Sequence, residues 1–285
     1  TNAVLHMLAI AYEAHVDFTL DDFGAAASEV PHLVAMIPAG PYTLLDFYEA
    51  GGVQAVMKEI ESRIATSCIT CTGSTVAENL EKYAHNRNSE LIHSLDKPVH
   101  QWSGIAILHG NLAPEGAVTK PSAIPAEAHK FTGKAVIFEN EQDALEGIRA
   151  LKVKEGQVVV IRNEGPRGGP GMPEQYKAMK LLVGMKLGSK VCLITDGRFS
   201  GSNNGCFVGH ICPEAYDDGP IKYLRDGDTI TIDVDKGTIN ADVDFEARRA
   251  EGARSHESKA EGYLYHYRHS CESASRGALI KTRDE

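Results

Sequence analysis

The stretch that decides the fold is VVVIRNEGPRGGPGMPEQYKAMKLLVGMKL, residues 158–187. It opens with four β-branched residues at 158–161, which is typical of a buried strand. A helical pattern of apolar residues then runs over residues 173–187. A second apolar run at residues 191–195 predicts another strand. This alternation of strand and helix indicates an α/β fold.

The rest of the chain divides into a helical part and a β-rich part. Apolar residues at helical spacing predict helices at residues 3–14, 20–31, 52–64 and 75–83. After Asp96-Lys97-Pro98, further strands are expected at residues 105–108, 134–138 and 229–234, with helices at 141–150 and 245–253. We therefore expect one domain over residues 1–97 and a second over residues 98–285.

The composition excludes several classes of protein. A formal net charge of −10 argues against a nucleic-acid surface, which needs a basic stripe. No apolar run approaches the roughly 20 residues that cross a bilayer, so no membrane partner is expected. The six cysteines are scattered and follow no secretory signal, which favours a reducing cytoplasmic location.

The loop GPRGGPGMPE, residues 165–174, follows the predicted strand and opens the predicted helix. Pro173 suits a first helical turn, because its missing N–H has no intrahelical partner there. The glycines allow something small to approach the backbone closely. No Gly-Lys-Ser/Thr follows, so the loop is not a P-loop, and it lacks the dinucleotide fingerprint.

Two interpretations are open for Glu174, which lies at the predicted start of this helix. A carboxylate at a helix N-terminus is stabilised by the helix dipole and needs no further role. Alternatively, Glu174 is a ligand for a hard cation on a rigid turn, because carboxylate oxygens suit magnesium.

A second loop, TDGRFSGS at residues 195–202, follows the other predicted strand. Ligands commonly bind where strands of α/β proteins end. Ser200 is a candidate nucleophile or base there, although its spacing is not that of the hydrolase elbow. The alternative is a turn serine that bonds to backbone. His210 is a candidate acid or base, and a structural role is equally open for it.

Two other segments carry weaker signals. Cys68 and Cys71 have metal or redox spacing, but no second cysteine pair or companion histidine accompanies them. The loop GNLAPEG, residues 110–116, is rich in turn residues and is expected to be structural.

Together these segments resemble the dihydroxy-acid dehydratase and sugar-acid dehydratase family. The resemblance covers nearly the whole chain. It is carried by TNAVLH (1–6), GNLAPEG (110–116), GPRGGPGMPE (165–174), TDGRFSG (195–201), GHICPEA (209–215) and DGD (226–228).

The resemblance implies a two-domain enzyme with its site between the domains. An amino-terminal α/β domain would carry an iron–sulfur cluster on three cysteines and most ligands of a Mg²⁺ ion. A carboxy-terminal β-barrel-like swivelling domain, flanked by helices, would follow it. By resemblance, Glu174 would bind magnesium, Ser200 would be the catalytic base, and Ser202 would assist through its hydroxyl.

The family reaction implied is removal of water from a 2,3-dihydroxy carboxylic acid to give a 2-keto acid. The loops look most like those of the branched-chain amino-acid pathway enzyme, and a sugar-acid (aldonate) dehydratase is the alternative. The family's cluster cysteines and its other magnesium ligands have no match here. We therefore expect the chain to begin inside the first domain and to be inactive by itself. Family members are commonly dimers or tetramers, which implies a homo-oligomer.

Two hypotheses of other classes remain open from the residues. A serine hydrolase would use Ser200 as nucleophile and His210 as base, without a metal. A non-catalytic binding or structural module would fold and show no dehydratase activity.

Overall fold

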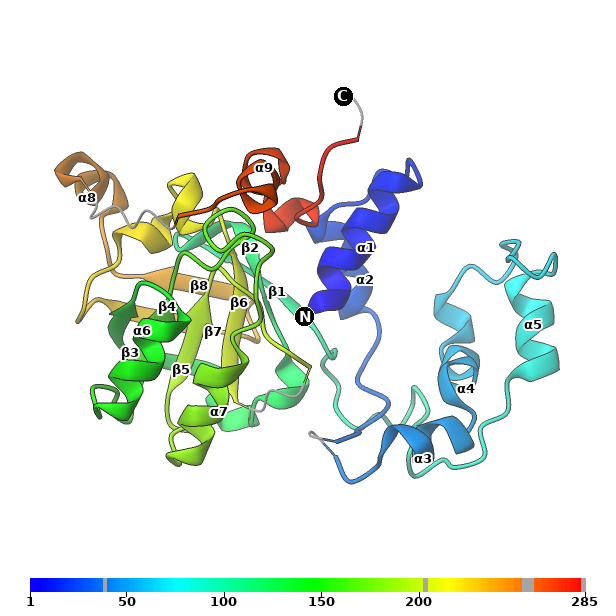
Figure 1. Ribbon diagram of the computed structural model, residues 1–285. Helices are drawn as coiled ribbons and strands as arrows, with labels where there is room; N and C mark the ends of the chain where they lie inside the picture. The colour runs from blue at the N-terminus through cyan, green and yellow to red at the C-terminus, as the bar shows by residue number, and fades with distance from the viewer. Residues whose placement is uncertain (38–39, 202–204, 253–258, 283–285) are drawn as a thin grey trace. The chain divides into compact units, whose positions relative to one another are not determined.

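The computed structural model describes residues 1–37, 40–201, 205–252 and 259–282, and eight strands close into a barrel within them. Around the barrel the order is β1-β2-β6-β5-β4-β3-β7-β8 (Figure 1). The strands are β1 Ala106–Gly110, β2 Ala113–Thr119, β3 Lys130–Phe138, β4 Gln157–Ile161, β5 Cys192–Thr195, β6 Cys206–Cys212, β7 Thr229–Asp233 and β8 Thr238–Ala241.

One side of the barrel is parallel, from β3 through β4 and β5 to β6. Helices α6, Glu141–Arg149, and α7, Tyr176–Gly184, connect these strands and lie outside the barrel (Figure 1). In β4, Val158 and Val160 belong to the barrel interior, whereas Val159 and Ile161 pack in the layer under α6 and α7. Both faces of the strand are therefore buried, which explains its unbroken apolar sequence.

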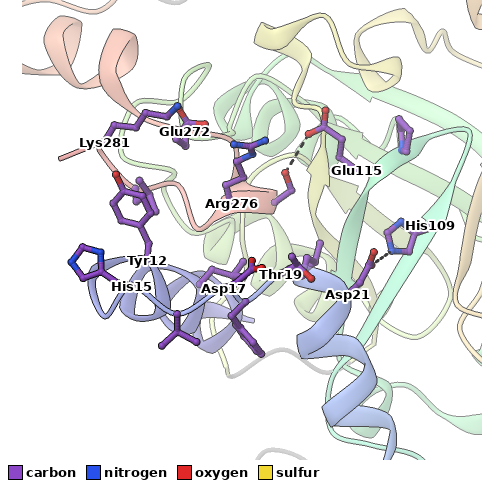
Figure 2. Close-up of a pocket in the computed structure, with 17 residues that line it drawn as sticks. Tyr12, His15, Asp17, Thr19, Asp21, His109, Glu115, Glu272, Arg276 and Lys281 are labelled. Atoms are coloured by element: carbon purple, nitrogen blue, oxygen red, sulfur yellow. Dashed lines mark hydrogen bonds and ion pairs between the residues drawn. The ribbon is translucent and has the colours of Figure 1, made fainter. Parts of the chain in front are cut away.

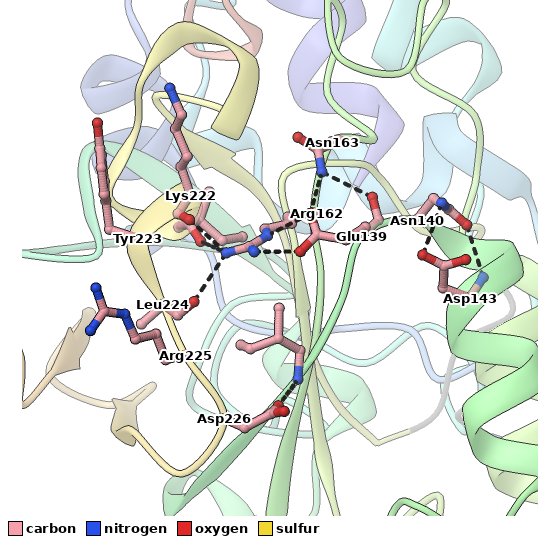
Figure 3. Close-up of polar contacts among 12 residues, drawn as sticks. Glu139, Asn140, Asp143, Arg162, Asn163, Lys222, Tyr223, Leu224, Arg225 and Asp226 are labelled. Carbon is pink, nitrogen blue, oxygen red and sulfur yellow. Dashed lines mark hydrogen bonds and ion pairs between the residues drawn. The ribbon is translucent and has the colours of Figure 1, made fainter. Parts of the chain in front are cut away.

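The end of β4 is held by a buried guanidinium (Figure 3). Arg162 is 7% exposed, and its Nη1 donates to the carbonyl oxygens of Ile221, Lys222 and Leu224 at 3.3, 2.6 and 3.1 Å. Its Nε donates to the Glu139 carboxylate at 3.0 Å. The hydrogen bonds of Arg162 therefore fix the position at which the loop after β4 begins.

The chain divides into two compact units, one of residues 1–24 and 105–285 and one of residues 25–104. The helices not yet named are α1 Asn2–Glu13, α2 Leu20–Ser28, α3 Leu44–Glu49, α4 Gly52–Glu59, α5 Val76–Tyr83, α8 Phe245–Glu251 and α9 Tyr263–Ser270. The boundary expected near residue 97 concerns the family's two domains and stays a prediction. None of the described helices has the length and apolar character needed to span a membrane.

The smaller unit has its own core, built on Ala50, Ala55, Leu91 and Ile92. A capping box begins α5: the Thr75 hydroxyl accepts from the Glu78 N–H, and the Glu78 carboxylate accepts from the Thr75 N–H. This capping box satisfies two N–H groups that the helix itself leaves without partners.

The mixed α/β fold class and the β-barrel are confirmed, with several local differences, among them the unpredicted helices α3 and α9. The turn-rich segment at residues 110–116 is expected to be a loop, but its residues 113–116 belong to strand β2, which pairs with β1 and β6. Strands β6 and β8 were not predicted. Helix α7 begins at Tyr176 and not at Pro173.

Candidate functional site

The loops that carry Glu174 and Ser200 leave the barrel from neighbouring parallel strands. Ile161 at the end of β4 pairs with Thr195 at the end of β5, so both loops start at one edge. Pairing resumes beyond the strands in an isolated parallel bridge between Glu174 and Arg198. There the Gln175 N–H donates to the Arg198 carbonyl oxygen at 2.8 Å. The two loops therefore lie side by side, with Ser200 two residues beyond the bridge.

Glu174 lies in an extended segment before α7, so the prediction that it occupies the first helical turn is wrong. The reason is that another carboxylate caps this helix. Glu141 Oε1 accepts from the N–H groups of Lys177 and Ala178 at 2.9 and 3.0 Å. The Glu174 side chain is thus not used for capping.

The Glu174 carboxylate is half-buried and oriented by an amide from α1. Asn2 Nδ2 donates to Glu174 Oε1 at 2.7 Å. The other amide atom, Asn2 Oδ1, is buried and has no hydrogen-bond partner among the residues that the structure describes. A carboxylate and an unsatisfied amide oxygen are therefore neighbours.

This pair of oxygen donors fits a magnesium ion in part. Magnesium prefers six oxygen ligands, and it is often held by one or two carboxylates with water or substrate completing the shell. No group of three or more His, Cys, Asp or Glu side chains suited to a metal occurs in the described part of the chain. Cys68 and Cys71 are accordingly two exposed thiols outside any such group.

The Ser200 loop is anchored by the residues on either side of the serine. Phe199 is fully buried and packs against Phe207 with ring centroids 5.4 Å apart. On the other side, Lys120 Nζ donates to the Gly201 carbonyl oxygen at 2.8 Å, and burial lowers the Lys120 pKa. The half-buried Ser200 is thus followed in the chain by a carbonyl group that a partly desolvated cation holds.

Ser202, the second hydroxyl assigned by resemblance, lies outside the described residues. So do its neighbours Asn203 and Asn204.

His210 is buried on β6 and is not arranged as a base for Ser200. Its Nε2 hydrogen-bonds the Thr1 hydroxyl at 2.9 Å, and its Nδ1 is buried without a partner in the described residues. Burial, together with the charge of Arg198, lowers the His210 pKa to about 3. The ring is therefore neutral at physiological pH, and neither nitrogen pairs with Ser200 as the hydrolase hypothesis requires.

Family models match both parts of the chain. The model described as dihydroxy-acid/6-phosphogluconate dehydratase N-terminal matches residues 1–79, and its C-terminal counterpart matches residues 90–278. The chain belongs to the dihydroxy-acid/6-phosphogluconate dehydratase family.

Curated relatives agree with this family. The chain is 45% identical over 290 residues to the dihydroxy-acid dehydratase of Syntrophobacter fumaroxidans, covering 100% of the chain and 52% of that protein. Identity to the dihydroxy-acid dehydratases of Oceanobacillus iheyensis and Streptococcus sanguinis is 44% and 45%, over 98% of the chain and 50% and 49% of those proteins. The chain thus spans about half the length of the relatives it matches.

In this dehydratase-family chain, three glycines of the loop at residues 165–174 admit the protein's own carboxylates. A Cβ on Gly165 would lie 2.5 Å from Glu214 Oε2, and one on Gly168 would lie 3.0 Å from the same atom. A Cβ on Gly169 would lie 3.0 Å from Glu164 Oε2. These glycines do allow a close approach to the backbone, as expected. The groups that approach are carboxyl groups of the protein itself.

Buried acids behind the two loops were missed by sequence reasoning. The fully buried Asp196 accepts from the N–H groups of Asn163, Glu164 and Ala215. Burial raises the pKa of Glu164 to about 7, and burial together with Asp196 raises the pKa of Glu214 to about 8. In the sequence, each of these acids stands at or shortly after the end of an apolar run. Acidic residues are also common there because they favour turns, so this position gave no specific signal.

A separate cavity of about 840 Å³ lies between α1, β1 and the carboxy-terminal segment, and Glu174 and Ser200 do not line it (Figure 2). Its charged side chains largely pair with each other. His109 bonds Asp21 at 3.0 Å, and Lys281 lies 3.5 Å from Glu272. The cavity therefore offers a ligand few uncommitted charges.

Proposed function

We propose that this chain supplies Glu174 and Ser200 to a hydro-lyase that converts a 2,3-dihydroxy carboxylic acid to a 2-keto acid. The family and the printed names of its relatives support this reaction class. The observation that carries the assignment to residues is the bridge between Glu174 and Arg198, which brings the two loops together. Because relatives at 44–45% identity are named dihydroxy-acid dehydratases, that substrate is favoured over an aldonate, with a place in branched-chain amino-acid biosynthesis.

Ser200 would remove the proton at C2 of the substrate. A serine hydroxyl is a weak base unless its ionised form is stabilised by nearby positive charge. Lys120, bonded to the carbonyl of the next residue, supplies one such charge. Phe199 fixes the backbone on the other side, so the hydroxyl has little freedom to leave the site.

Glu174 would hold a Mg²⁺ ion, with Asn2 Oδ1 as a second oxygen donor. When bound, this ion supplies Lewis-acid stabilisation of negative charge that develops on the substrate. Asn2 also orients the carboxylate through its amide nitrogen, and such outer partners fix the direction of a ligand.

Three further features belong to the proposal by family membership. An iron–sulfur cluster would assist departure of the C3 hydroxyl, with residues 1–97 forming part of the domain that binds it. Ser202 would assist Ser200. The protein would work in the cytoplasm as a homodimer or homotetramer.

The test uses the protein that the complete gene encodes, loaded with Mg²⁺ and cluster. Ser200→Ala should lower 2-keto acid formation by about 10²–10⁴-fold, as expected for loss of a positioned base, while a 2,3-dihydroxy acid still binds in calorimetry. Ser275→Ala, a half-buried serine bonded to Glu115, is the matched control and should keep normal turnover. Normal turnover of Ser200→Ala would exclude the serine as base.

A second variant tests the metal role. Glu174→Gln should lower the bound Mg²⁺, measured by elemental analysis of the purified protein, because a neutral amide is a weaker ligand than a carboxylate. Unchanged magnesium content would remove Glu174 from the metal site. Labelling of Ser200 by a fluorophosphonate in metal-free protein would instead favour a hydrolase.

A further inference from the structure

One peptide group of the loop that carries Glu174 is held at one end by a carboxyl group and at the other end by a guanidinium. The N–H of Gly168 donates to Glu214 Oε2 at 2.7 Å. The carbonyl oxygen of Arg167, in the same peptide group, accepts from Arg268 Nε at 2.7 Å. The peptide dipole thus lies between a carboxylate at its positive end and a guanidinium at its negative end.

Both charged side chains are buried and come from distant parts of the chain. Glu214 follows β6 and is 3% exposed, and Arg268 lies on α9 and is 6% exposed. Each makes a second bond to the loop: Glu214 Oε1 accepts from the Arg167 N–H at 2.8 Å, and Arg268 Nη2 donates to the Gly168 carbonyl at 3.3 Å. The bonds from the Arg268 guanidinium are charge-assisted, and such bonds are roughly twice as strong as neutral ones. The bonds to Glu214 gain the same strength when its carboxyl group, whose pKa is raised to about 8, is ionised.

These charges are expensive to bury, and their burial is not explained by stability alone. Burying an ionisable side chain costs desolvation free energy that its interactions often fail to recover. The Glu214 pKa, raised by burial and by Asp196, reflects this cost. In some proteins, buried ionisable groups serve to specify one geometry.

Further hydrogen bonds restrict the segment between the Arg167–Gly168 peptide group and Glu174. The Gly169 N–H donates to the Gly165 carbonyl at 2.9 Å, and the Met172 N–H donates to the Gly169 carbonyl at 2.7 Å. Met172 is buried, and its carbonyl accepts from Arg198 Nε at 2.6 Å. Glu174 lies two residues after Met172 and forms the isolated β-bridge with Arg198.

We propose that Glu214 and Arg268 form a clamp on the Arg167–Gly168 peptide group and are positioning residues for the Glu174 carboxylate. The link to a metal rests on the proposed function, in which Glu174 is the ligand. The clamp itself does not depend on that function.

The experiment compares three variants of the full-length, Mg²⁺-loaded protein. Glu214→Gln keeps the size of the side chain but presents an N–H to one of the two backbone donors. The double variant Glu214→Leu with Arg268→Met removes both charges together, so that no unpaired buried charge prevents folding. Asp217→Asn is the control, because Asp217 bonds the side chain of Arg167 and not the clamped peptide.

Amide hydrogen exchange, followed by mass spectrometry, measures the loop directly. Exchange at residues 166–172 should rise at least about tenfold in Glu214→Gln and in the folded double variant, while Asp217→Asn stays near the unaltered protein. Unchanged protection of the loop in the folded double variant would overturn the clamp.

Calorimetric titration of the same proteins with Mg²⁺, after the bound metal has been removed with a chelator, then tests the link to Glu174. The two clamp variants should bind Mg²⁺ about 10–100-fold more weakly, the usual effect of losing a partner that orients a ligand. A loosened loop with unchanged Mg²⁺ affinity would overturn the positioning role. If the unaltered protein bound no Mg²⁺, the proposed function would fail, and the exchange data would still decide the clamp.

Discussion

The loop that carries Glu174 and the loop that carries Ser200 leave the same edge of the barrel, yet they are held by different forces. The first is held mainly by buried charges, with Glu164, Glu214 and Arg268 around its glycines. The second is held by an apolar anchor, Phe199, and by one lysine bond to its backbone.

The difference follows from what each loop would have to do. A metal ligand must keep its direction within narrow limits, and hydrogen bonds to charged groups have strong directional preference. Apolar packing fixes position well but has no direction of its own. The comparison predicts that the two loops respond to different perturbations.

The largest effect is expected from removing the apolar anchor. Phe199→Ala should lower the free energy of unfolding by about 3–5 kcal/mol, because a fully buried aromatic leaves a cavity beside Phe207. Urea denaturation measures it. Tyr263→Ala, at a side chain 73% exposed on α9, should change stability by less than about 0.5 kcal/mol. A loss below about 1 kcal/mol for Phe199→Ala would mean that the loop is held by other contacts.

We expect the pH dependence of the free energy of unfolding to come from the buried acids beside the loop at residues 165–174. The folded pKa values of Glu164 and Glu214, about 7 and about 8, lie above their ordinary value of 4.5. The folded state therefore retains protons that the unfolded chain has lost. Between about pH 4.5 and pH 8 these groups should lower the free energy of unfolding as pH rises.

Denaturation at a series of pH values checks this prediction against Glu214→Gln. The variant should show a flatter dependence between pH 5 and pH 8, because an amide does not titrate. A variant with the same slope as the unaltered protein would contradict the raised Glu214 pKa.

A smaller effect is expected from crowding the carboxylate of Glu214. Gly165→Ala should destabilise by about 1–3 kcal/mol, since its Cβ would lie 2.5 Å from Glu214 Oε2. Combining it with Glu214→Gly should cost less than the sum of the two changes, because the contacts with the carboxyl group and with the Glu214 Cβ at 2.7 Å are then absent. Gly184→Ala, with nothing within 4 Å of its Cβ, should be neutral or slightly stabilising. Strictly additive losses in the free energy of unfolding would show that Gly165 and Glu214 do not interact.

The smallest effect is expected for the partly exposed ion pair on the charged loop. Asp217→Asn removes the 2.9 Å contact with Arg167, whose side chain is 32% exposed. Such pairs contribute roughly 0–1 kcal/mol, so thermal unfolding should shift little. A loss above about 2 kcal/mol would show that the Arg167 side chain, and not its peptide group, holds the loop.

The local elements of this protein follow from its sequence. The apolar run of β4, the helical spacing of α6 and the Thr75–Glu78 capping box depend on near neighbours, so each was predictable. The predicted strands at residues 158–161 and 191–195 end shortly before the Glu174 and Ser200 loops, and the parallel pairing of β4 with β5 places both loops at one edge. The motifs of those loops pointed to the family before any fold was known.

The tertiary structure alone decided which groups serve each loop. Glu141 and not Glu174 caps α7, and the glycines at 165 and 168 make room for Glu214. Arg268 reaches a peptide group 101 residues away in sequence. The physical reason is that backbone preferences act over a few residues, whereas partners of buried charges are set by which strands and helices the closed barrel brings together.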